Sequence, residues 1–590
     1  MISLDASTKV VSKLMLRLLP VQVLMAAVSA VEGIVASYFA SNYIGIDAMS
    51  AVGLYGPVTL LLSAFGLMMS GGSAILCGKY LGRNEQDKVQ NVFSLNLLGS
   101  GGIAAVFAVL FLLLGTCDLT GFFTQDEAVR PLFNRYLIGQ AIGVIPVVLG
   151  NQLPAYLAME NRQGRALAAS LTFIGVNVLL NFLFVQVMHM EAFGLALASS
   201  IGMWVFFGIQ AQFFLLPKAS MHLRLRDLKW REGLEILRIG LPGAASTGYQ
   251  AARGIIVNHL LEVFVGSIGI SAFAASDSLL RIFWAIPAGM LAVSRLLISI
   301  SVGEEDRQTL TDVMRVMFKR FIPIMCAFCA MIILCAKPFA GVFFRDPSEP
   351  VYRMTVLGFR ILPLCMPLSI ILMHFVCYAQ ASAKHVLVHI LSLLDGVVCV
   401  AGFSALLIRW MGIGSVYTAN VLNGIVCLLT IILYSCLQKK KFPGNMEELM
   451  VIPEEFGAKE EERIDIAVRS MEEVLSVSRQ VTDFCRKRGI DERRTYLASL
   501  CMEEMAGNIV EHGFTKDRKK HSIDIRVVHK ESDIILRIRD DCIPFDPQER
   551  RELTAPGDIL KNAGIRIVYQ IARSVEYQNI LGLNVLTMRI

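Results

Sequence analysis

The sequence predicts an α-helical membrane protein of twelve transmembrane helices in two repeated six-helix halves, followed by a smaller cytoplasmic α/β domain. Three observations predict this class. The chain of 590 residues is 55% hydrophobic and only 18% charged, with a mean hydropathy of +0.57. Long apolar runs recur from residue 14 to residue 437, and the remainder of the chain is polar. This composition excludes a single soluble domain.

Each apolar run is long enough to cross a hydrocarbon layer of roughly 30 Å. The first run is too long for a signal peptide, and no Ala-x-Ala cleavage site follows a short apolar core. We therefore count it as a span. The twelve predicted spans are residues 14–38, 48–77, 91–115, 131–157, 165–187, 192–216, 234–262, 268–299, 316–340, 354–380, 385–408 and 414–437.

Basic residues are concentrated in alternate loops, which predicts the orientation of the chain. The basic loops contain residues 79–88, 162–165, 218–231, 307–320 and 439–441. Loops rich in Lys and Arg stay inside, so we expect both termini to be cytoplasmic in a multi-pass protein of the bacterial plasma membrane. The net charge of +6 reflects this bias and requires no nucleic-acid partner.

An internal repeat divides the membrane region into two halves. Residues 45–89 align without a gap on residues 266–310, an offset of 221 that pairs Gly82 with Gly303. Both copies end in a charged loop. The repeat predicts two halves of the same orientation, related by an axis along the membrane normal, with a transport cavity between them. The alternative is chance similarity between apolar helices.

The segment Tyr43-Ile-Gly-Ile-Asp-Ala-Met-Ser-Ala-Val-Gly53, followed by Gly78-x3-Gly82, resembles the opening of MATE (multidrug and toxin extrusion) transporters. Further similarities to this family are Gly240-Leu-Pro242, Asn177-x3-Asn181 and Gln380. The resemblance covers about residues 10–440. It implies ion-coupled export of small organic, often cationic compounds by rocking of the two halves. Lipid-linked-sugar flippases share this architecture and remain an alternative.

Polar side chains inside the spans are the candidate transport residues, because a charge at the bilayer centre costs roughly 2.5–3.5 kcal/mol. The resemblance places Glu32 near the family's acidic cation-binding position, where it would bind Na⁺ or H⁺; a structural hydrogen-bonding role is the alternative. The resemblance also assigns Asn177 and Asn181 to the transport site. Asp277 and Arg281 are four residues apart and are expected to neutralise each other, in preference to binding a substrate.

The chain turns polar after the last span and is broken at Pro443-Gly444 and Pro453, which predicts a linker. We therefore expect a transporter of residues 1–441, a linker of residues 442–462 and a C-terminal domain of residues 463–590. In that domain the pattern predicts an opening strand, two helices, a β-hairpin, a further helix and two final strands. Their expected positions are 464–468, 471–488, 497–513, 522–528 with 534–538, 562–568 and the last residues to 590.

Glu504, Asn508 and His512 recur every four residues in the second of these helices, so they share one face. A carboxylate one turn from an amide suits a magnesium-nucleotide site. The amide oxygen can ligate Mg²⁺ and the carboxylate can accept a proton. The alternative is a solvated face on an amphipathic helix.

The order of these elements, with Glu-x3-Asn-x3-His and with Asp540 followed by Asp546-Pro547, resembles the Bergerat-fold (GHKL) ATPases, particularly the anti-sigma-factor serine kinases. The resemblance implies that the domain binds ATP and Mg²⁺. Glu504 would be the general base, Asn508 the magnesium ligand and Asp540 the carboxylate that reads the adenine amino group.

The resemblance also places Gly564 in the loop that folds over the phosphates, and assigns His512, Phe545 and Arg566 to nucleotide binding. Cys542 and Pro544 stand where the family usually has glycine. Arg566 stands where a further glycine is expected and could contact a phosphate directly. Whether the domain turns over ATP is left open.

Two functions of different classes fit the sequence. One is an exporter with a nucleotide-binding regulatory domain. The other is a membrane-anchored serine kinase whose protein partner is of the anti-sigma-antagonist type. Twelve repeated spans exceed what an anchor requires, which favours transport. A sensor histidine kinase is excluded because no histidine lies between His389 and His512. The chain lacks the Gly-x4-Gly-Lys-Ser/Thr loop, so an ion gradient is the expected driving force.

Overall fold

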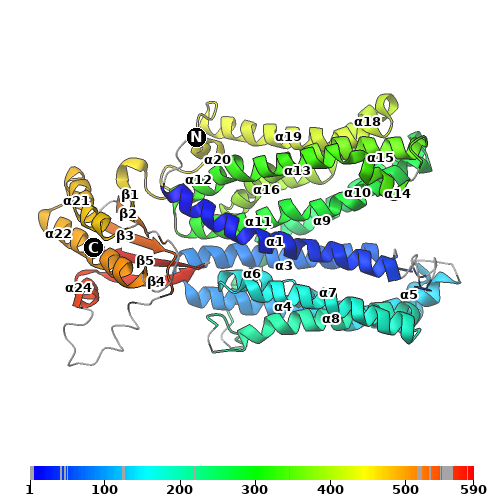
Figure 1. The fold of residues 1–590 in the computed structure, drawn as a ribbon, viewed down its shortest axis with the longest axis horizontal. Coiled ribbons are helices and arrows are strands. Elements are labelled where there is room, and N and C mark those ends of the chain that lie inside the picture. The colour runs from blue at the N-terminus through cyan, green and yellow to red at the C-terminus, as the bar shows by residue number, and fades with distance from the viewer. Residues whose placement is uncertain are drawn as a thin grey trace.

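The structure, a computed structural model, describes residues 6–39, 43–44, 48, 51–52, 54–122, 127–217, 219–226, 228–344, 346–468, 470–514, 521, 523–530, 533–544, 547, 563–580 and 582–590. It consists of a bundle of long helices and a small α/β domain that caps one end of the bundle (Figure 1). The start of the first helix lies at the same end as this domain.

The first half of the bundle is formed by helices within residues 6–214. They are α1 (Ala6–Phe39), α3 (Gly56–Gly82), α4 (Gln86–Thr116), α5 (Val129–Gly150), α6 (Leu153–Met159), α7 (Gln163–Asn181) and α8 (Glu191–Phe214). A π-helical turn, η3 (Phe182–Val187), extends α7, and a short 3₁₀ turn, η2 (Leu119–Phe122), follows α4.

The second half repeats this arrangement with more interruptions. Its helices are α9 (Trp230–Phe264), α10 (Ser267–Phe283), α11 (Ala285–Gly303), α12 (Arg307–Val316), α13 (Ile322–Leu334), α14 (Ala336–Phe343), α15 (Pro350–Ile361), α16 (Cys365–Ala381), α17 (His385–Leu393), α18 (Cys399–Met411) and α19 (Gly414–Lys439). Three turns join neighbouring pieces: η4 (Met317–Phe321), η5 (Leu362–Leu364) and η6 (Leu394–Val398).

Within the described parts of the chain, ten helical segments are long and apolar enough to cross a membrane. Helices α1 and α9, of 34 and 35 residues, occupy the positions of the first and seventh predicted spans. The helical membrane class predicted from the sequence is therefore confirmed.

Backbone geometry confirms the internal repeat. Asn84 and Glu305 are 221 residues apart, and both adopt left-handed conformations, with φ of 57° and 53°. In each loop the next N–H turns back to the preceding helix: Glu85 N donates to Tyr80 O and Asp306 N to Ser301 O, both at 2.9 Å. The loops that end the two repeat copies thus have the same backbone conformation.

The two halves touch through glycines near these loops. A Cβ atom on Gly82 would lie 2.3 Å from the carbonyl oxygen of Ile300, and one on Gly303 would lie 2.1 Å from that of Lys79. Only residues without side chains allow this backbone approach. Helices α3 and α11 therefore meet directly at the end of the bundle next to the C-terminal domain.

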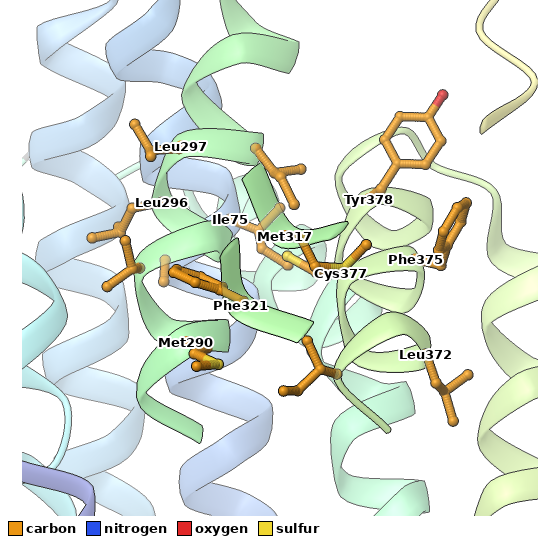
Figure 2. Packing of buried hydrophobic residues seen from close by; sticks show 14 of the residues in the cluster. Ile75, Met290, Leu296, Leu297, Met317, Phe321, Leu372, Phe375, Cys377 and Tyr378 are labelled. Carbon is orange, nitrogen blue, oxygen red and sulfur yellow. The ribbon is translucent and has the colours of Figure 1, made fainter. Parts of the chain in front are cut away.

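A shared hydrophobic core joins the halves behind this contact. Figure 2 shows Ile75 of α3 beside Met317 and Phe321 of η4, with Leu296 of α11 close by. Ile75, Met317 and Phe321 are fully buried. The first half therefore contributes to the same packed cluster as the second.

The C-terminal domain contains a five-stranded antiparallel sheet in the order β1-β2-β3-β5-β4. The strands are β1 (Arg463–Val468), β2 (Ile523–Lys530), β3 (Asp533–Asp540), β4 (Ser574–Ile580) and β5 (Leu583–Arg589). Three helices, α21 (Met471–Lys487), α22 (Glu492–Asn508) and α24 (Ala563–Ile571), share a hydrophobic core with the sheet. The predicted strands and helices are all present, with ends shifted by a few residues. The opposite face of the sheet is turned to the bundle (Figure 1).

The segment between the two parts is packed against the second half. It contains a short helix, α20 (Met446–Met450), and a 3₁₀ turn, η7 (Glu460–Glu462). The Lys384 Nζ atom donates to the carbonyl oxygens of Met450 and Val451, both at 2.7 Å. This segment therefore fixes the start of β1 relative to the bundle.

Candidate functional site

The candidate nucleotide site is built around α22. The helix begins after Asp491, whose Oδ1 accepts a hydrogen bond of 3.0 Å from Arg494 N, as expected of an N-cap. Its buried face packs in the domain core through Cys501, Met502, Met505 and Ala506. Glu504 and Asn508 lie one turn apart beside this face and are half-buried. Their side chains therefore stand at the edge of the core, as a ligand site requires.

The regular helix ends at Asn508, and the chain continues as a π-helical turn, η8 (Ile509–Gly513). His512 lies on this turn and is exposed. Single π-helical turns are frequent at functional sites. Gly513 packs against Cys542, since a Cβ atom there would lie 3.0 Å from Sγ. The thiol at position 542, where the GHKL pattern has glycine, thus fills space beside the end of this turn.

Gly564, at the start of α24, lies against the carboxylate of Glu504. A Cβ atom on residue 564 would lie 2.0 Å from Oε2 of Glu504. The N-terminal end of a helix carries free N–H groups and favours negative charge. The structure thus brings together two residues that are 60 positions apart and that the sequence assigned to the same site.

Asp540 ends β3 and is buried, with 5% of its surface exposed. Its Oδ1 accepts hydrogen bonds from Asn584 Nδ2 (2.7 Å) and from the backbone N of Cys542 (2.9 Å). Burial raises the pKa of Asp540 above its ordinary value, and these two donors oppose the shift. The carboxylate is therefore held in one orientation by its own domain.

The next residue, Asp541, connects the domain to α1. Its Oδ1 lies 3.0 Å from Nδ1 of His521, and its Oδ2 lies 2.6 Å from Nζ of Lys13. Burial would raise the pKa of Asp541, but Lys13 and His521 outweigh it and lower the pKa. Sequence reasoning gave no role to Lys13 or Asp541.

These residues fit an adenine nucleotide with Mg²⁺. The oriented carboxylate of Asp540 would accept a hydrogen bond from the adenine amino group, and Asn508, half-buried on α22, would offer one oxygen to the metal. Among the described residues no cluster of three or more His, Cys, Asp or Glu side chains could hold a metal ion. Magnesium in nucleotide sites takes one or two protein ligands and completes its shell with phosphates and water, so a single amide ligand is compatible. Arg566 lies on α24 and is half-buried, and Phe545 lies outside the described residues.

A second polar cluster lies inside the first half of the bundle. Asn177 Nδ2 donates to Ser199 Oγ at 3.1 Å, and Asn181 Nδ2 donates to Asn177 Oδ1 at 3.1 Å. Both asparagines are almost fully buried, and Oδ1 of Asn181 is buried without a hydrogen-bond partner. An unsatisfied buried oxygen calls for a donor or a cation. Ser199 is a member that the sequence analysis missed.

The other transport candidates lie on different helices, α1 and α10. Glu32 lies within α1, and its side chain is outside the described part of the structure. Arg281 Nη2 and Asp277 Oδ2 form an i,i+4 ion pair at 2.8 Å, with both side chains exposed. The mutual neutralisation expected for this pair is therefore present.

Comparisons with known proteins agree with both parts of the chain. The family profile described as MatE matches residues 22–183, and the profile of the histidine kinase-like ATPase domain matches residues 468–590. The multidrug export protein MepA of Staphylococcus haemolyticus is 20% identical over 336 residues, which span 56% of this chain and 73% of MepA.

Solved structures give the same result for the fold. A transporter of the MOP superfamily from Pyrococcus furiosus superposes with a TM-score of 0.65 at 21% identity, covering 75% of this chain and 100% of its own. The Vibrio cholerae MATE transporter VcmN gives 0.68 at 16% identity, with coverage of 74% and 99%. The chain thus contains a MatE family domain, matched over residues 22–183, and a C-terminal histidine kinase-like ATPase domain, and its membrane part has the fold of solved MATE transporters.

Proposed function

We propose that the protein is an ion-coupled exporter of small organic, often cationic compounds, and that its C-terminal domain binds Mg-ATP and regulates transport from the cytoplasm. The proposal rests on how much of the solved transporters this chain matches. Solved MATE-fold transporters are matched over 99–100% of their own length by about three quarters of this chain. The membrane part therefore has the complete fold of these transporters, and the C-terminal domain is an addition to it.

The proposed division places the transporter in residues 1–441, the linker in residues 442–462 and the regulatory domain in residues 463–590. It is supported by the end of α19 at Lys439 and by the start of β1 at Arg463. Both termini are proposed to be cytoplasmic. The ion pair between Lys13 and Asp541 supports this orientation, because it places the start of α1 on the same side as the C-terminal domain.

An ion gradient is proposed as the driving force, with Glu32 as the ligand of Na⁺ or H⁺ and with Asn177 and Asn181 in the transport site of the first half. Asn181 supports this role through its buried, unpaired Oδ1. The relative MepA is named a multidrug export protein, which supports a small organic substrate for this chain.

The regulatory role is proposed for the residues around α22. Glu504 would accept a proton during any phosphoryl transfer, Asn508 would ligate Mg²⁺, and Asp540 would read adenine. Gly564, His512, Phe545 and Arg566 would complete the site. Bound Mg-ATP would supply the transferable phosphoryl group, and the chain's own residues would orient it and hold the proton at Glu504.

Efflux from proteoliposomes that contain the full-length protein tests the proposal. An imposed Na⁺ or H⁺ gradient should drive export of organic cations without nucleotide, and addition of ATP should change the rate. Export that requires ATP hydrolysis and ignores both gradients would contradict it. A protein that exports none of a broad panel of cations, but phosphorylates a soluble partner, would support the anchored kinase instead.

A further inference from the structure

A cluster of three arginines, Arg526, Arg537 and Arg539, lies on the face of the sheet that is turned to the bundle. In β3, Ile534, Leu536 and Ile538 point into the domain core, so Arg537 and Arg539 project from the opposite face. Arg526 of β2 lies directly across from Arg537 in the strand register. Like charges facing each other across a sheet are destabilising, so this face requires acidic partners.

Within the domain, Asp465 of β1 pairs with Arg526 at 2.5 Å. The partners from the bundle are Glu304 and Asp306, in the loop between α11 and α12. Arg539 Nη2 lies 2.5 Å from Glu304 Oε2 and 2.7 Å from Asp306 Oδ2. Arg537 Nη1 lies 3.0 Å from Glu304 Oε2, and Arg526 Nη1 donates to Asp306 Oδ1. The side chains of Glu304 and Asp306 are 6% and 1% exposed. The arginine face is therefore anchored to the second half through buried ion pairs.

Asp306 is central to this anchor. It also caps α12, since its Oδ1 accepts from Thr309 N at 2.9 Å. Burial would raise the pKa of Asp306, but Arg526, Arg539 and Arg537 outweigh it and hold the pKa well below its ordinary value. Arg307 adds to the attachment by donating to Phe456 O (2.9 Å) and Glu447 Oε2 (2.7 Å) of the linker.

The C-terminal domain touches the first half much more lightly. Lys13 of α1 pairs with Asp541, but the Lys13 side chain is 63% exposed, and exposed ion pairs contribute little stability. Asn84 Nδ2, in the loop between α3 and α4, donates to Glu576 Oε2 of β4 at 3.2 Å. Gly582 packs against Asn161, because a Cβ atom on residue 582 would lie 2.8 Å from its Nδ2. Arg83 occupies the repeat position of Glu304, so this loop lacks one of the two carboxylates that bind the arginine face.

A cavity of about 430 Å³ lies between the sheet and the two loops. It is lined by residues of all three parts, among them Arg83, Glu304, Arg526, Arg537, Glu576 and Arg589. The sheet is thus packed closely on the loop between α11 and α12 of the second half. The domain's contacts with the first half include one hydrogen bond beside the cavity, one close packing contact at Asn161 and the exposed ion pair of Asp541 with Lys13. The contact with the first half is the one that can be released at lower cost.

If the two halves rock apart, the motion changes the contacts that the sheet makes with each of them. Gly82 and Gly303 bring α3 and α11 into backbone contact beside the sheet, and opening this end of the bundle must separate them. A continuous five-stranded sheet cannot follow two loops that move apart. Since its bonds to the second half are the stronger ones, the contact between Asn84 and Glu576 has to break first.

We propose that the ATPase-like domain is a clamp on the transporter: it stays anchored to Glu304 and Asp306 of the second half, and its contacts through Asp541, Glu576 and Gly582 hold the first half only while this end is closed. The inference rests on the proposed transport function, because only halves that rock apart give the clamp a motion to oppose.

Hydrogen bonds connect the nucleotide site to β4 and β5, the hairpin whose residues Glu576 and Gly582 contact the first half. Asp540 follows Arg539 in β3 and accepts from Asn584 of β5. The Oδ1 of Asn584 accepts in turn from Asn579 of β4 at 2.8 Å, three residues before Gly582. A nucleotide that contacts Asp540 would therefore act, through Asn584 and Asn579, on the turn at Gly582 that packs against Asn161. Binding of nucleotide is expected to change how firmly the clamp holds the first half.

Energy transfer between two fluorophores tests the clamp without relying on transport. The labels are placed by unnatural amino acids at Asp87, in the first half, and at Gln438, at the end of α19, both of which are exposed. Glu576→Ala and Asn84→Gly each remove the light contact, and glycine keeps the left-handed backbone at residue 84. Each should raise the ratio of open to closed molecules by about threefold, the change expected for one hydrogen bond of ordinary net strength.

The double variant Glu576→Ala/Asn84→Gly should open no further than either single variant, because both remove the same bond. Arg537→Ala/Arg539→Ala should release the whole domain and raise the ratio by at least about tenfold. Arg573→Ala is the matched control, since Arg573 pairs with Asp533 on the exposed edge of the same domain. It should leave the ratio unchanged.

Unchanged ratios in all the interface variants would overturn the clamp, even if efflux is normal. Additive effects of the two single variants would overturn the pairing of Asn84 with Glu576. A label distance that responds as expected in a protein that exports nothing would instead contradict the proposed function and leave the clamp as a property of the fold.

Discussion

Gly564 rests on the carboxylate of Glu504, with space for a hydrogen atom but not for a methyl group: a Cβ atom would lie 2.0 Å from Oε2. This contact joins the start of α24 to the middle of α22. It places the proposed general base at a helix end that favours negative charge. The contact explains on steric grounds why residue 564 is a glycine.

Gly564→Ala should displace the Glu504 carboxylate and lower the free energy of unfolding of the domain by no more than about 1 kcal/mol, because the atom that must move is the end of a flexible side chain. Thermal unfolding of the full-length protein, with and without Mg-ATP, measures the effect. Gly507→Ala is the control. Its Cβ would meet only Met471, at 3.9 Å, so it should stabilise α22 by up to about 1 kcal/mol. Equal effects of the two substitutions would contradict the contact.

Glu504→Gln should remove any phosphoryl transfer and leave ATP binding intact, because a base is lost while no phosphate ligand is. Asn508→Ala should weaken binding of Mg-ATP itself, and should do so less when Mg²⁺ is omitted. Isothermal titration and a phosphorylation assay on the full-length protein separate the two outcomes. Equal loss of binding in both variants would show that the two roles are assigned wrongly.

Asp306→Asn tests the anchor. Asparagine retains a good N-cap for α12, but it leaves Arg526, Arg537 and Arg539 without their shared carboxylate. Breaking a buried ion pair from one side costs about 3–5 kcal/mol, so domain docking should be strongly weakened. Hydrogen exchange in β3 and α12 reports docking. Glu85→Gln, at the repeat-related position, should leave that exchange unchanged.

The pH dependence of docking follows from the same carboxylate. The pKa of Asp306 in the folded protein is depressed. The stabilisation of docking by its ionised carboxylate is therefore fully present above the unfolded pKa of about 3.9, and it is lost as the pH falls through the folded pKa. Exchange protection at the interface should therefore be constant from about pH 8 to pH 5. Loss of protection near pH 6 would show that another group controls docking.

Glu32→Gln should abolish gradient-driven efflux while folded protein remains in the membrane, since the proposed ion ligand loses its charge. Proteoliposome efflux under an imposed gradient is the measurement. Asp277→Asn is a suitable control, because Asp277 forms an exposed pair with Arg281. Undiminished transport by Glu32→Gln would rule out its role in coupling.

The sheet and the repeat could be predicted because each leaves a regular pattern. Ile534, Leu536 and Ile538 alternate with polar residues, as a half-buried strand requires. The equal offset between Gly82 and Gly303 indicated two copies of one half. The π-helical turn after Asn508 could not be predicted, since a spacing of four residues is compatible with a regular helix.

The arginine face was missed for a physical reason. Asp306 has a sufficient local explanation as the cap of α12, and Arg526 has one as a polar position on a strand. They are 220 residues apart, and only the docking of the two parts joins them. The signal in the sequence was the pair of arginines at positions 537 and 539 on one face of a strand, which calls for acidic partners on a facing surface.

Efflux by a chain that ends after residue 445 tests the central claim most directly. If the membrane part is the exporter and the C-terminal domain regulates it, the truncated protein should still export organic cations down an imposed ion gradient. Its rate should no longer respond to ATP, whereas that of the full-length protein should. A folded truncated protein with no transport, beside a full-length protein that transports only while hydrolysing ATP, would contradict the claim.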